Sequence, residues 1–174
     1  MQRSRVESLV PFLVGLLVLV ADQVTKSLVV SQLSLGQTVD LFSWLSPLIR
    51  LTYITNTGVA LGLFPSLGSV FKVVPLVVVA ILLVYNRQLP NGEWLTRIAL
   101  GLQMGGALGN LVDRLVRGAV VDFLDFNFWP LKTWPIFNLS DASVVAGAAL
   151  LGLTLLLQPE KDPREETVAE SGLL

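Results

Sequence analysis

The chain has 174 residues, of which 53% are hydrophobic and only 14% are charged, and its formal net charge is -1. A soluble domain of this length would need more charge on its surface, so the composition and the mean hydropathy of +0.70 indicate an integral membrane protein. The charge balance argues against a nucleic-acid partner. Histidine and cysteine are absent, which excludes thiolate nucleophiles and Ser-His pairs. Acid–base chemistry must therefore come from Asp, Glu, Lys, Tyr or water, and we expect no metal and no cofactor.

Four apolar stretches are long enough to cross a bilayer core of about 30 Å as helices. They cover residues 9–30, 70–85, 94–116 and 141–157. The first stretch resembles a secretory signal peptide, but Asp22, Gln23 and Lys26 lie inside it and no small-residue cleavage site follows. We therefore interpret it as a retained span.

The distribution of Lys and Arg outside these stretches predicts the orientation. Six basic residues lie on the side of the termini, against three on the other side. The six are Arg3, Arg5, Arg87, Arg97, Lys161 and Arg164, and the three are Arg50, Arg117 and Lys132. Basic residues stay preferentially in the cytoplasm, so we expect both termini there.

Two segments then lie outside the membrane. Residues 31–67 alternate apolar and polar side chains between Gly and Pro residues, which predicts a small antiparallel sheet with Trp44 and Phe64 at the headgroup level. Residues 117–140 are rich in aromatic side chains, which suggests contact with the interface. The polar tail, 159–174, is expected to be disordered and cytoplasmic.

The predicted fold is thus an all-α integral membrane protein, with four transmembrane helices and a small extramembrane antiparallel β-sheet on the outer side. Residues 1–158 would form one domain. Gly101, Gly105 and Gly109 recur every four residues, a pattern that lets helices approach closely in lipid. We expect them to pack the third predicted helix against the fourth.

The most informative residues are the polar ones in or beside these helices, because charged groups at bilayer depth are costly and usually functional. Asn110, Asp113 and Arg114 share one helical face, where an internal Asp–Arg pair is the structural alternative to a functional role. Asp22 and Lys26 are also spaced to form such a pair.

Asp122 follows the third predicted helix closely and Asp141 begins the fourth, so both are expected at the outer interface. If the third and fourth predicted helices touch, these carboxylates can face each other across a water. Two close carboxylates share a proton, and one acid with one base can activate water for peptide hydrolysis. The alternative for Asp141 is helix capping.

Five motifs occur in order along the chain. They are Asp22-Gln-Val-Thr-Lys26, Asn56-Thr-Gly-Val-Ala60, Gly105-Gly-Ala-Leu-Gly-Asn-Leu-Val-Asp-Arg114, Val120-Val-Asp-Phe123 and Phe137-Asn-Leu-Ser-Asp141. In these motifs the chain resembles bacterial lipoprotein signal peptidase (signal peptidase II), from about residue 10 to 155. The family commonly has alanine where this chain has Ser140. We expect this serine to retain activity and to be able to hydrogen-bond Asp141.

The resemblance implies a four-span aspartyl endopeptidase of the bacterial inner membrane, with its active site near the periplasmic face. Its substrates would be prolipoproteins, cut just before a lipobox cysteine that carries diacylglycerol. Asp122 and Asp141 would be the catalytic pair. The supporting residues would be Asn110, Arg114, Asn138, Asp113, Asn56, Gly58, Asp22 and Lys26. The sheet would cradle the substrate, residues 117–140 would form a gate, and globomycin-type cyclic peptides would inhibit.

Other functions stay open from the residues alone. Intramembrane Asp and Arg also mark proton or ion transporters, although no internal repeat supports that reading. A lipid-binding or assembly factor could use the aromatic outer segments. A Ser–Lys catalytic pair with Lys26 or Lys72 lacks an obvious serine partner.

Overall fold

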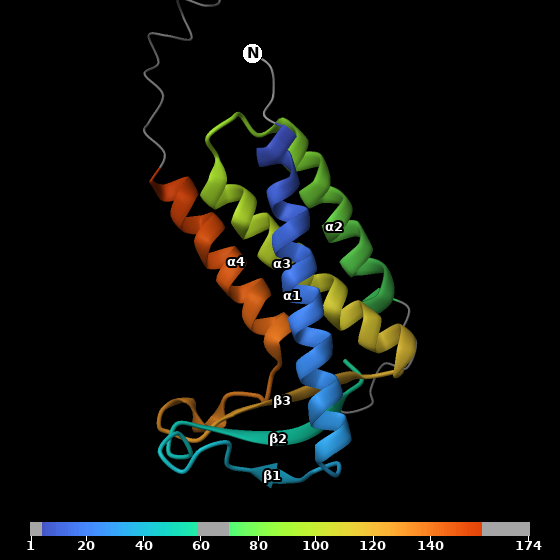
Figure 1. Cartoon of the computed structure of the whole chain (residues 1–174), viewed down its shortest axis with the longest axis vertical. Coiled ribbons are helices and arrows are strands. Elements are labelled where there is room, and N and C mark those ends of the chain that lie inside the picture. The colour runs from blue at the N-terminus through green and yellow to red at the C-terminus, as the bar shows by residue number, and fades with distance from the viewer. Residues whose placement is uncertain (1–4, 59–69, 158–174) are drawn as a thin grey trace, which may run out of the picture.

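The computed structural model describes residues 5–58 and 70–157. Four long helices form an elongated bundle, and a small sheet lies across one end of it (Figure 1). The helices are α1 (Arg5–Gln32), α2 (Val70–Gln88), α3 (Trp94–Val116) and α4 (Leu139–Leu156). The strands are β1 (Thr38–Val39), β2 (Ile49–Asn56) and β3 (Val120–Phe126), and a 3-10 turn, η3 (Leu131–Thr133), follows.

Three of the described helices, α1, α2 and α4, are long and apolar enough to cross a membrane. The helix α3 does not reach that level of hydropathy, because glycines and polar side chains interrupt its apolar run. It is nevertheless the central helix, since it packs against α1, α2 and α4. Its less apolar surface is thereby covered by protein rather than left to lipid.

The expected elements are present at close to the expected positions. The helix α3 has the predicted bounds, whereas α1 and α2 extend further than the apolar stretches do. The helix α4 begins at Leu139, two residues before the predicted start, so Asp141 lies inside its first turn. Residues 59–67 of the predicted sheet segment, which include Phe64, and the predicted tail 159–174 lie outside the described residues.

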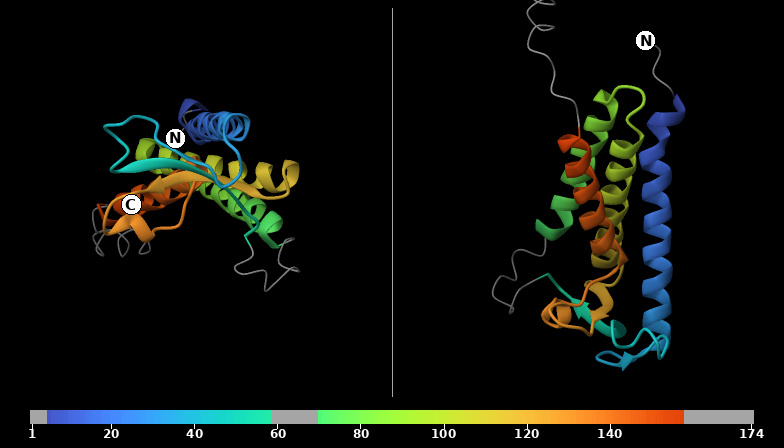
Figure 2. Two further views of the ribbon diagram at one scale, coloured as in Figure 1. Left: turned by 90° about the horizontal axis from the view of Figure 1, so that it is seen from below. Right: turned by 90° about the vertical axis from the view of Figure 1, so that its left-hand side faces the viewer.

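The sheet has three antiparallel strands in the order β1-β2-β3. Only β1 and β2 come from the segment predicted to form it. The third strand comes from the second outer segment, and β2 pairs with it from Ile49 opposite Phe126 to Asn56 opposite Val120. This pairing joins segments about 70 residues apart in sequence and places Asp122 on the strand β3. The strand lies next to the helix ends, as Figure 2 shows from below and from the side.

The glycines of α3 do not all face α4, which corrects the expected packing. A Cβ at Gly101 or Gly105 would meet α1, with Val14 and Val18 side chains as close as 2.6 Å. A Cβ at Gly109 would meet Ser140 of α4 and also Asp22 of α1. The central helix therefore uses one glycine surface for α1 and another for α4, and both interfaces require close backbone approach.

At the end of the bundle remote from the sheet, Arg97 is an interior group rather than a loop charge. Its side chain is 3% exposed and donates hydrogen bonds to the carbonyl oxygens of Leu89 (3.1 Å) and Pro90 (3.2 Å), as well as to the side chain of Asn86. These bonds satisfy carbonyl groups at the C-terminal end of α2 that lack helical partners. Arg97 therefore links α2 to α3. It is not a free loop charge of the kind that the prediction of membrane orientation counted.

Replacing Gly105 by alanine tests the α1–α3 contact. The new Cβ would lie 2.6 Å from the carbonyl oxygen of Gly15, and backbone cannot move aside cheaply. Overpacking of this kind costs about 1–3 kcal/mol, so we expect a lower unfolding temperature in detergent. Gly152→Ala is the matched control, because no atom lies within 4 Å of its added Cβ. Equal unfolding temperatures for the two variants would contradict the packing described here.

Candidate active site

Asn138 joins the two aspartates that the sequence singled out. It is the N-cap of α4, where its side-chain oxygen accepts the backbone N–H of Asp141 at 2.9 Å and its own N–H reaches Asp141 Oδ2 at 3.2 Å. Its Nδ2 donates to Asp122 Oδ1 at 2.6 Å. The capping role expected as the alternative for Asp141 is therefore real, and the same cap links α4 to the aspartate on β3.

Asn110 of α3 supplies a second link to the same carboxylate. Its Nδ2 donates to Asp141 Oδ1 at 2.7 Å, while its Oδ1 accepts from Asn138 Nδ2 at 3.1 Å and from Lys26 Nζ at 3.0 Å. An ammonium group can only donate, so Lys26 requires the oxygen of this amide to face it. The nitrogen must then face Asp141. Lys26 thereby fixes the direction of the hydrogen bonds that link it through Asn110 to Asp141.

Asp122 is 1% exposed and accepts two amide hydrogen bonds. One comes from Asn138, and the other from Nδ2 of Asn56 at 3.1 Å. Gly58 orients that second amide, since its N–H donates to Asn56 Oδ1 at 2.8 Å and its φ of 74° is one that glycine adopts readily. Burial raises the pKa of Asp122, the charge of Asp141 adds to the rise, and the Asn56 and Asn138 hydrogen bonds oppose it.

Arg114 brings positive charge to this group of side chains. Its guanidinium interacts electrostatically with Asp141 and Asp122, and it lies 5.6 Å from the ring centroid of Phe71 in α2. One of its nitrogens donates to the carbonyl of Asn110 at 3.2 Å. An arginine so placed, with a buried Nε that has no partner, can donate to a ligand held beside the carboxylates.

A separate buried ionic cluster lies behind these residues. Lys26 Nζ is 2.9 Å from both Asp22 Oδ2 and Asp113 Oδ2, and all three side chains are fully buried. Asp113 also binds Arg117 and accepts the backbone N–H of Val121 at 3.0 Å. Asp22 and Lys26 pair as their spacing predicts, whereas the expected Asp113–Arg114 pair is replaced by Asp113 with Lys26 and Arg117.

All ten residues singled out from the sequence thus fall into two connected groups. Around the two carboxylates lie Asn56, Gly58, Asn110, Arg114, Asp122, Asn138 and Asp141, and in the ionic cluster lie Asp22, Lys26 and Asp113. The sequence reading missed the contribution of Arg117, which it counted as a loop charge. Its position four residues after Asp113 was the available signal.

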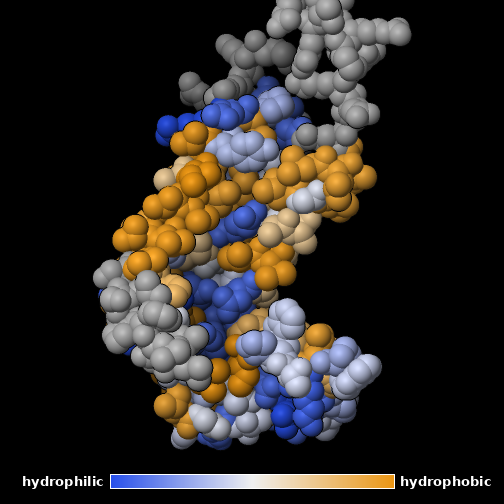
Figure 3. Space-filling model, turned by 180° about the vertical axis from the view of Figure 1, so that it is seen from behind, coloured by the Kyte–Doolittle hydropathy of each residue, from blue (hydrophilic) through white to orange (hydrophobic). Residues whose placement is uncertain are grey.

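The surface between the bundle and the sheet is hollowed and hydrophilic (Figure 3). Figure 3 shows the molecule from behind, with hydrophilic residues gathered in a hollow between the bundle and the sheet and hydrophobic helix surface above it. Within residues 5–58 and 70–157, no group of three or more acidic side chains could hold a metal ion. Two carboxylates, amide donors and a guanidinium are the chemistry available there, and these groups suit activation of water and stabilisation of an oxyanion.

Comparison with known proteins decides the family. A family model described as signal peptidase (SPase) II matches residues 14–157. The chain belongs to the signal peptidase II family. This family cleaves the signal peptides of lipoproteins, and it is a family of proteases.

Curated relatives named lipoprotein signal peptidase match over most of their length. The one from Halothermothrix orenii is 40% identical over 150 residues, which is 86% of this chain and 97% of the relative. The one from Moorella thermoacetica is 40% identical over 156 residues, with 89% and 99% covered. The one from Shewanella loihica is 37% identical over 161 residues, with 90% and 91% covered.

Two solved structures of a bacterial membrane enzyme, determined by the in meso method, share the fold. Both are 28% identical to this chain. One has a TM-score of 0.78 and covers 86% of this chain and 94% of its own, and the other has a TM-score of 0.75 with 87% and 93% covered. The bundle and sheet described above are therefore the architecture of a known membrane enzyme.

Ser140 directly precedes Asp141 in the first turn of α4. Its backbone N–H donates to Asp22 Oδ1 at 2.9 Å, but its hydroxyl is buried and makes no hydrogen bond, so the expected bond to Asp141 is not formed. A buried hydroxyl without a partner costs about 1–3 kcal/mol. The serine is therefore accommodated here at a cost in stability.

Ser140→Ala should accordingly raise the free energy of unfolding by about 1 kcal/mol, because it removes a desolvated hydroxyl and no hydrogen bond. Chemical denaturation in detergent would measure it. Ser143→Ala is the matched control on the same helix, since that hydroxyl donates to the Leu139 carbonyl at 2.8 Å and its loss should bring no gain. A destabilised Ser140→Ala variant would show that the hydroxyl has a partner after all.

Proposed function

We propose that this protein is an intramembrane aspartyl endopeptidase that removes signal peptides from diacylglyceryl-modified prolipoproteins, cutting immediately before the lipidated cysteine. The observation that carries this proposal is the bridge through Asn138, which binds Asp122 with its amide nitrogen and Asp141 with its amide oxygen and backbone N–H. The family supplies the class of substrate, and the bridge supplies a pair of carboxylates that can act together.

The surroundings of the two aspartates favour different protonation states. Asp141 lies in the first turn of α4, where the helix end stabilises negative charge, and it faces Arg114 and the Asn110 amide. Asp122 lies on a strand, and burial raises its pKa. We therefore assign the base to Asp141 and the acid to Asp122.

In this mechanism Asp141 takes a proton from a water held between the two carboxylates. The water oxygen then attacks the scissile carbonyl carbon, while Asp122 gives its proton to the carbonyl oxygen. In the transition state that leads to the tetrahedral diol, Arg114 and the amide nitrogens stabilise the partial negative charge on the carbonyl oxygen. Transfer of the proton from Asp141 to the leaving nitrogen breaks the C–N bond, and return of the other proton to Asp122 restores the starting state.

The same proposal includes a setting in the membrane. The helix α3 would cross the bilayer with the other three, shielded by them from lipid. Both termini would be cytoplasmic, and the sheet and the two carboxylates would lie at the periplasmic face of the inner membrane. Globomycin-type cyclic peptides would bind at the carboxylates, the sheet would cradle the substrate, and residues 117–140 would contribute to a gate.

Asp122→Asn and Asp141→Asn should each abolish cleavage, because each leaves the site without one of its two proton carriers. The assay is hydrolysis of a diacylglyceryl-modified lipobox peptide by purified protein, with the unfolding temperature measured alongside. Asp125→Asn is the matched control on β3, where the carboxylate accepts from Thr52 Oγ1 at 2.7 Å and does not touch the pair. Retained hydrolysis in either dyad variant would refute the mechanism, and charge movement across vesicles without hydrolysis would favour a transporter.

The rate of cleavage should follow a bell-shaped pH profile, and Asn56→Ala should move its alkaline limb to higher pH. The Asn56 amide stabilises ionised Asp122 and so lowers the pKa of that carboxyl. Without it, Asp122 keeps its proton to higher pH, and the acid remains available there. Asn127→Ala is the control, since that amide donates to the Ser46 carbonyl elsewhere on the sheet. A limb that moves to lower pH would contradict the assignment of Asp122 as the acid.

A further inference from the structure

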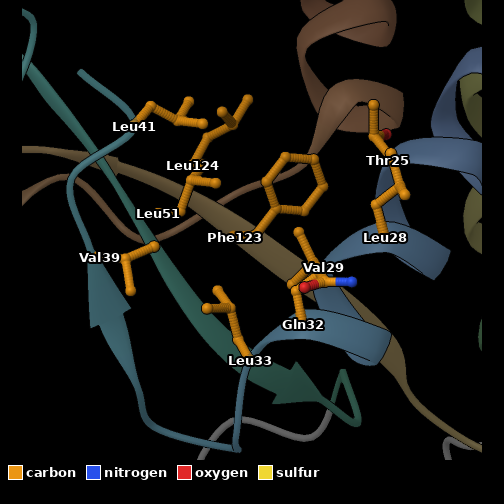
Figure 4. Close-up of a pocket in the computed structure, with 10 residues that line it drawn as sticks. All are labelled: Thr25, Leu28, Val29, Gln32, Leu33, Val39, Leu41, Leu51, Phe123 and Leu124. Carbon is orange, nitrogen blue, oxygen red and sulfur yellow. The ribbon is translucent and has the colours of Figure 1, made fainter.

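An apolar cavity of about 540 Å³ lies between the C-terminal end of α1 and the sheet (Figure 4). Its volume falls within the range of about 300–1,000 Å³ that is typical of pockets for small molecules. Eight of its ten lining residues are aliphatic or aromatic, and none is charged. The side chains in Figure 4 come from α1, from β2 and β3, and from the segment that contains β1.

Two residues of β3 that line the cavity are neighbours in sequence of one member of the proposed catalytic pair. Phe123 and Leu124 line it, and they follow Asp122 directly on β3. Successive residues of a strand advance about 3.3 Å, and Leu124 shares a face of the strand with Asp122. At the other end Leu41 is 49% exposed and Leu28 is 56% exposed, so the lining leads from the buried strand to the surface of α1.

The two polar residues of the lining leave the cavity largely apolar. The Thr25 hydroxyl shares its one hydrogen between the carbonyl oxygens of Ala21 (2.8 Å) and Asp22 (2.9 Å), so its donor is already used within the helix. Gln32 is an exposed residue in the last turn of α1. A charged ligand would therefore find no counter-charge in the cavity, whereas an uncharged hydrocarbon chain would lose nothing on entering it.

We propose that this cavity receives one acyl chain of the substrate's diacylglyceryl group and thereby positions the scissile bond. The inference rests on the proposed function, in which the lipid is attached through the side chain of the cysteine next to that bond. Only a few single bonds then separate the acyl chain from the attacked carbonyl, so apolar space close to Asp122 suits the first part of the chain. The cavity lined by Phe123 and Leu124 is such a space.

The cavity acts by orientation rather than by attraction. A bilayer interior is as apolar as the cavity, so a chain that moves from lipid into the cavity gains little hydrophobic free energy. Its anchoring instead restricts where the glyceryl group and the neighbouring peptide bond can lie. Misplacement by about 1 Å can cost roughly 100-fold in rate, so loss of the anchor should appear mainly in kcat.

The test compares Leu41→Trp, which fills the mouth of the cavity, with Leu48→Trp, a residue that is also 49% exposed but does not line it. Each is assayed on lipobox peptides that carry two palmitoyl or two acetyl chains on the glyceryl group. We expect Leu41→Trp to lower kcat at least about tenfold on the palmitoyl peptide. Its rate on the acetyl peptide should match that of the unsubstituted protein, and Leu48→Trp should change neither. Equal effects of the two variants, or no effect of either, would overturn the proposal.

Photo-crosslinking provides a second measurement that does not depend on the folding of a tryptophan variant. A palmitoyl chain with a mid-chain diazirine, on a peptide bound to the Asp141→Asn protein, should label residues 25–33, 39–51 or 123–124. Labels confined to other helices would overturn the proposal, as would equal labelling of these segments by a diazirine phospholipid. If the unsubstituted protein cleaves no lipobox peptide, the proposed function itself fails and this inference falls with it. If the protein cleaves the peptide, but Leu41→Trp has no effect and no label appears in the cavity, this inference is wrong while the proposed function stands.

Discussion

The buried ammonium group of Lys26 is the contact on which the rest of the site depends. Its three donors meet Asp22, Asp113 and the Asn110 amide oxygen at 2.9–3.0 Å, and the side chains of Lys26, Asp22 and Asp113 are fully buried. A charge in such surroundings is stable only when it is paired and hydrogen-bonded, so the geometry around it has little freedom. Because Lys26 cannot accept a hydrogen bond, it also sets which atom of Asn110 faces the carboxylates.

Both close helix packing and charge pairing therefore shape the site. Glycines at the α1–α3 and α3–α4 interfaces let backbones approach, and the approach brings Asp22, Lys26 and Asp113 together. Because these charges neutralise one another, the free-energy cost of burying them in a membrane protein is much reduced. The amides of Asn110 and Asn138 then carry a fixed orientation outwards to Asp141 and Asp122.

Much of this organisation could be predicted from the sequence. Apolar length located the four helices. The costly polar residues in or beside them pointed to Asp22, Lys26, Asn110, Asp113, Arg114, Asp122 and Asp141, whereas Asn56, Gly58 and the supporting role of Asn138 came from the family resemblance. The strand β3 was missed, because its pairing with β2 is a contact between distant segments and Asp122 and Asp125 interrupt its apolar pattern. The glycine repeat gave the correct kind of packing but the wrong partner for Gly101 and Gly105, since a spacing of four residues does not say which neighbour occupies a face.

The contacts of the site residues also divide into local ones, which the sequence could predict, and contacts between distant elements, which it could not. The spacing of Asp22 and Lys26 was enough to pair them, because both lie on one helix. The spacing of Arg117 four residues after Asp113 was also a local signal, whereas only the three-dimensional arrangement adds Lys26 from α1. The reciprocal cap between Asn138 and Asp141 could be read locally, whereas the further bond from Asn138 to Asp122 could not, since it crosses from α4 to β3.

The cap of α4 has a consequence for the newly made chain. Asn138 can hold Asp122 only after α4 has formed its first turn and docked against α3, and among the described helices α4 is the last to be synthesised. Before that step Asp122 and Asp141 belong to unconnected segments. If these two carboxylates form the proposed catalytic pair, hydrolytic capacity arises only with completion of the bundle, and a half-inserted intermediate could not cut its neighbours in the bilayer.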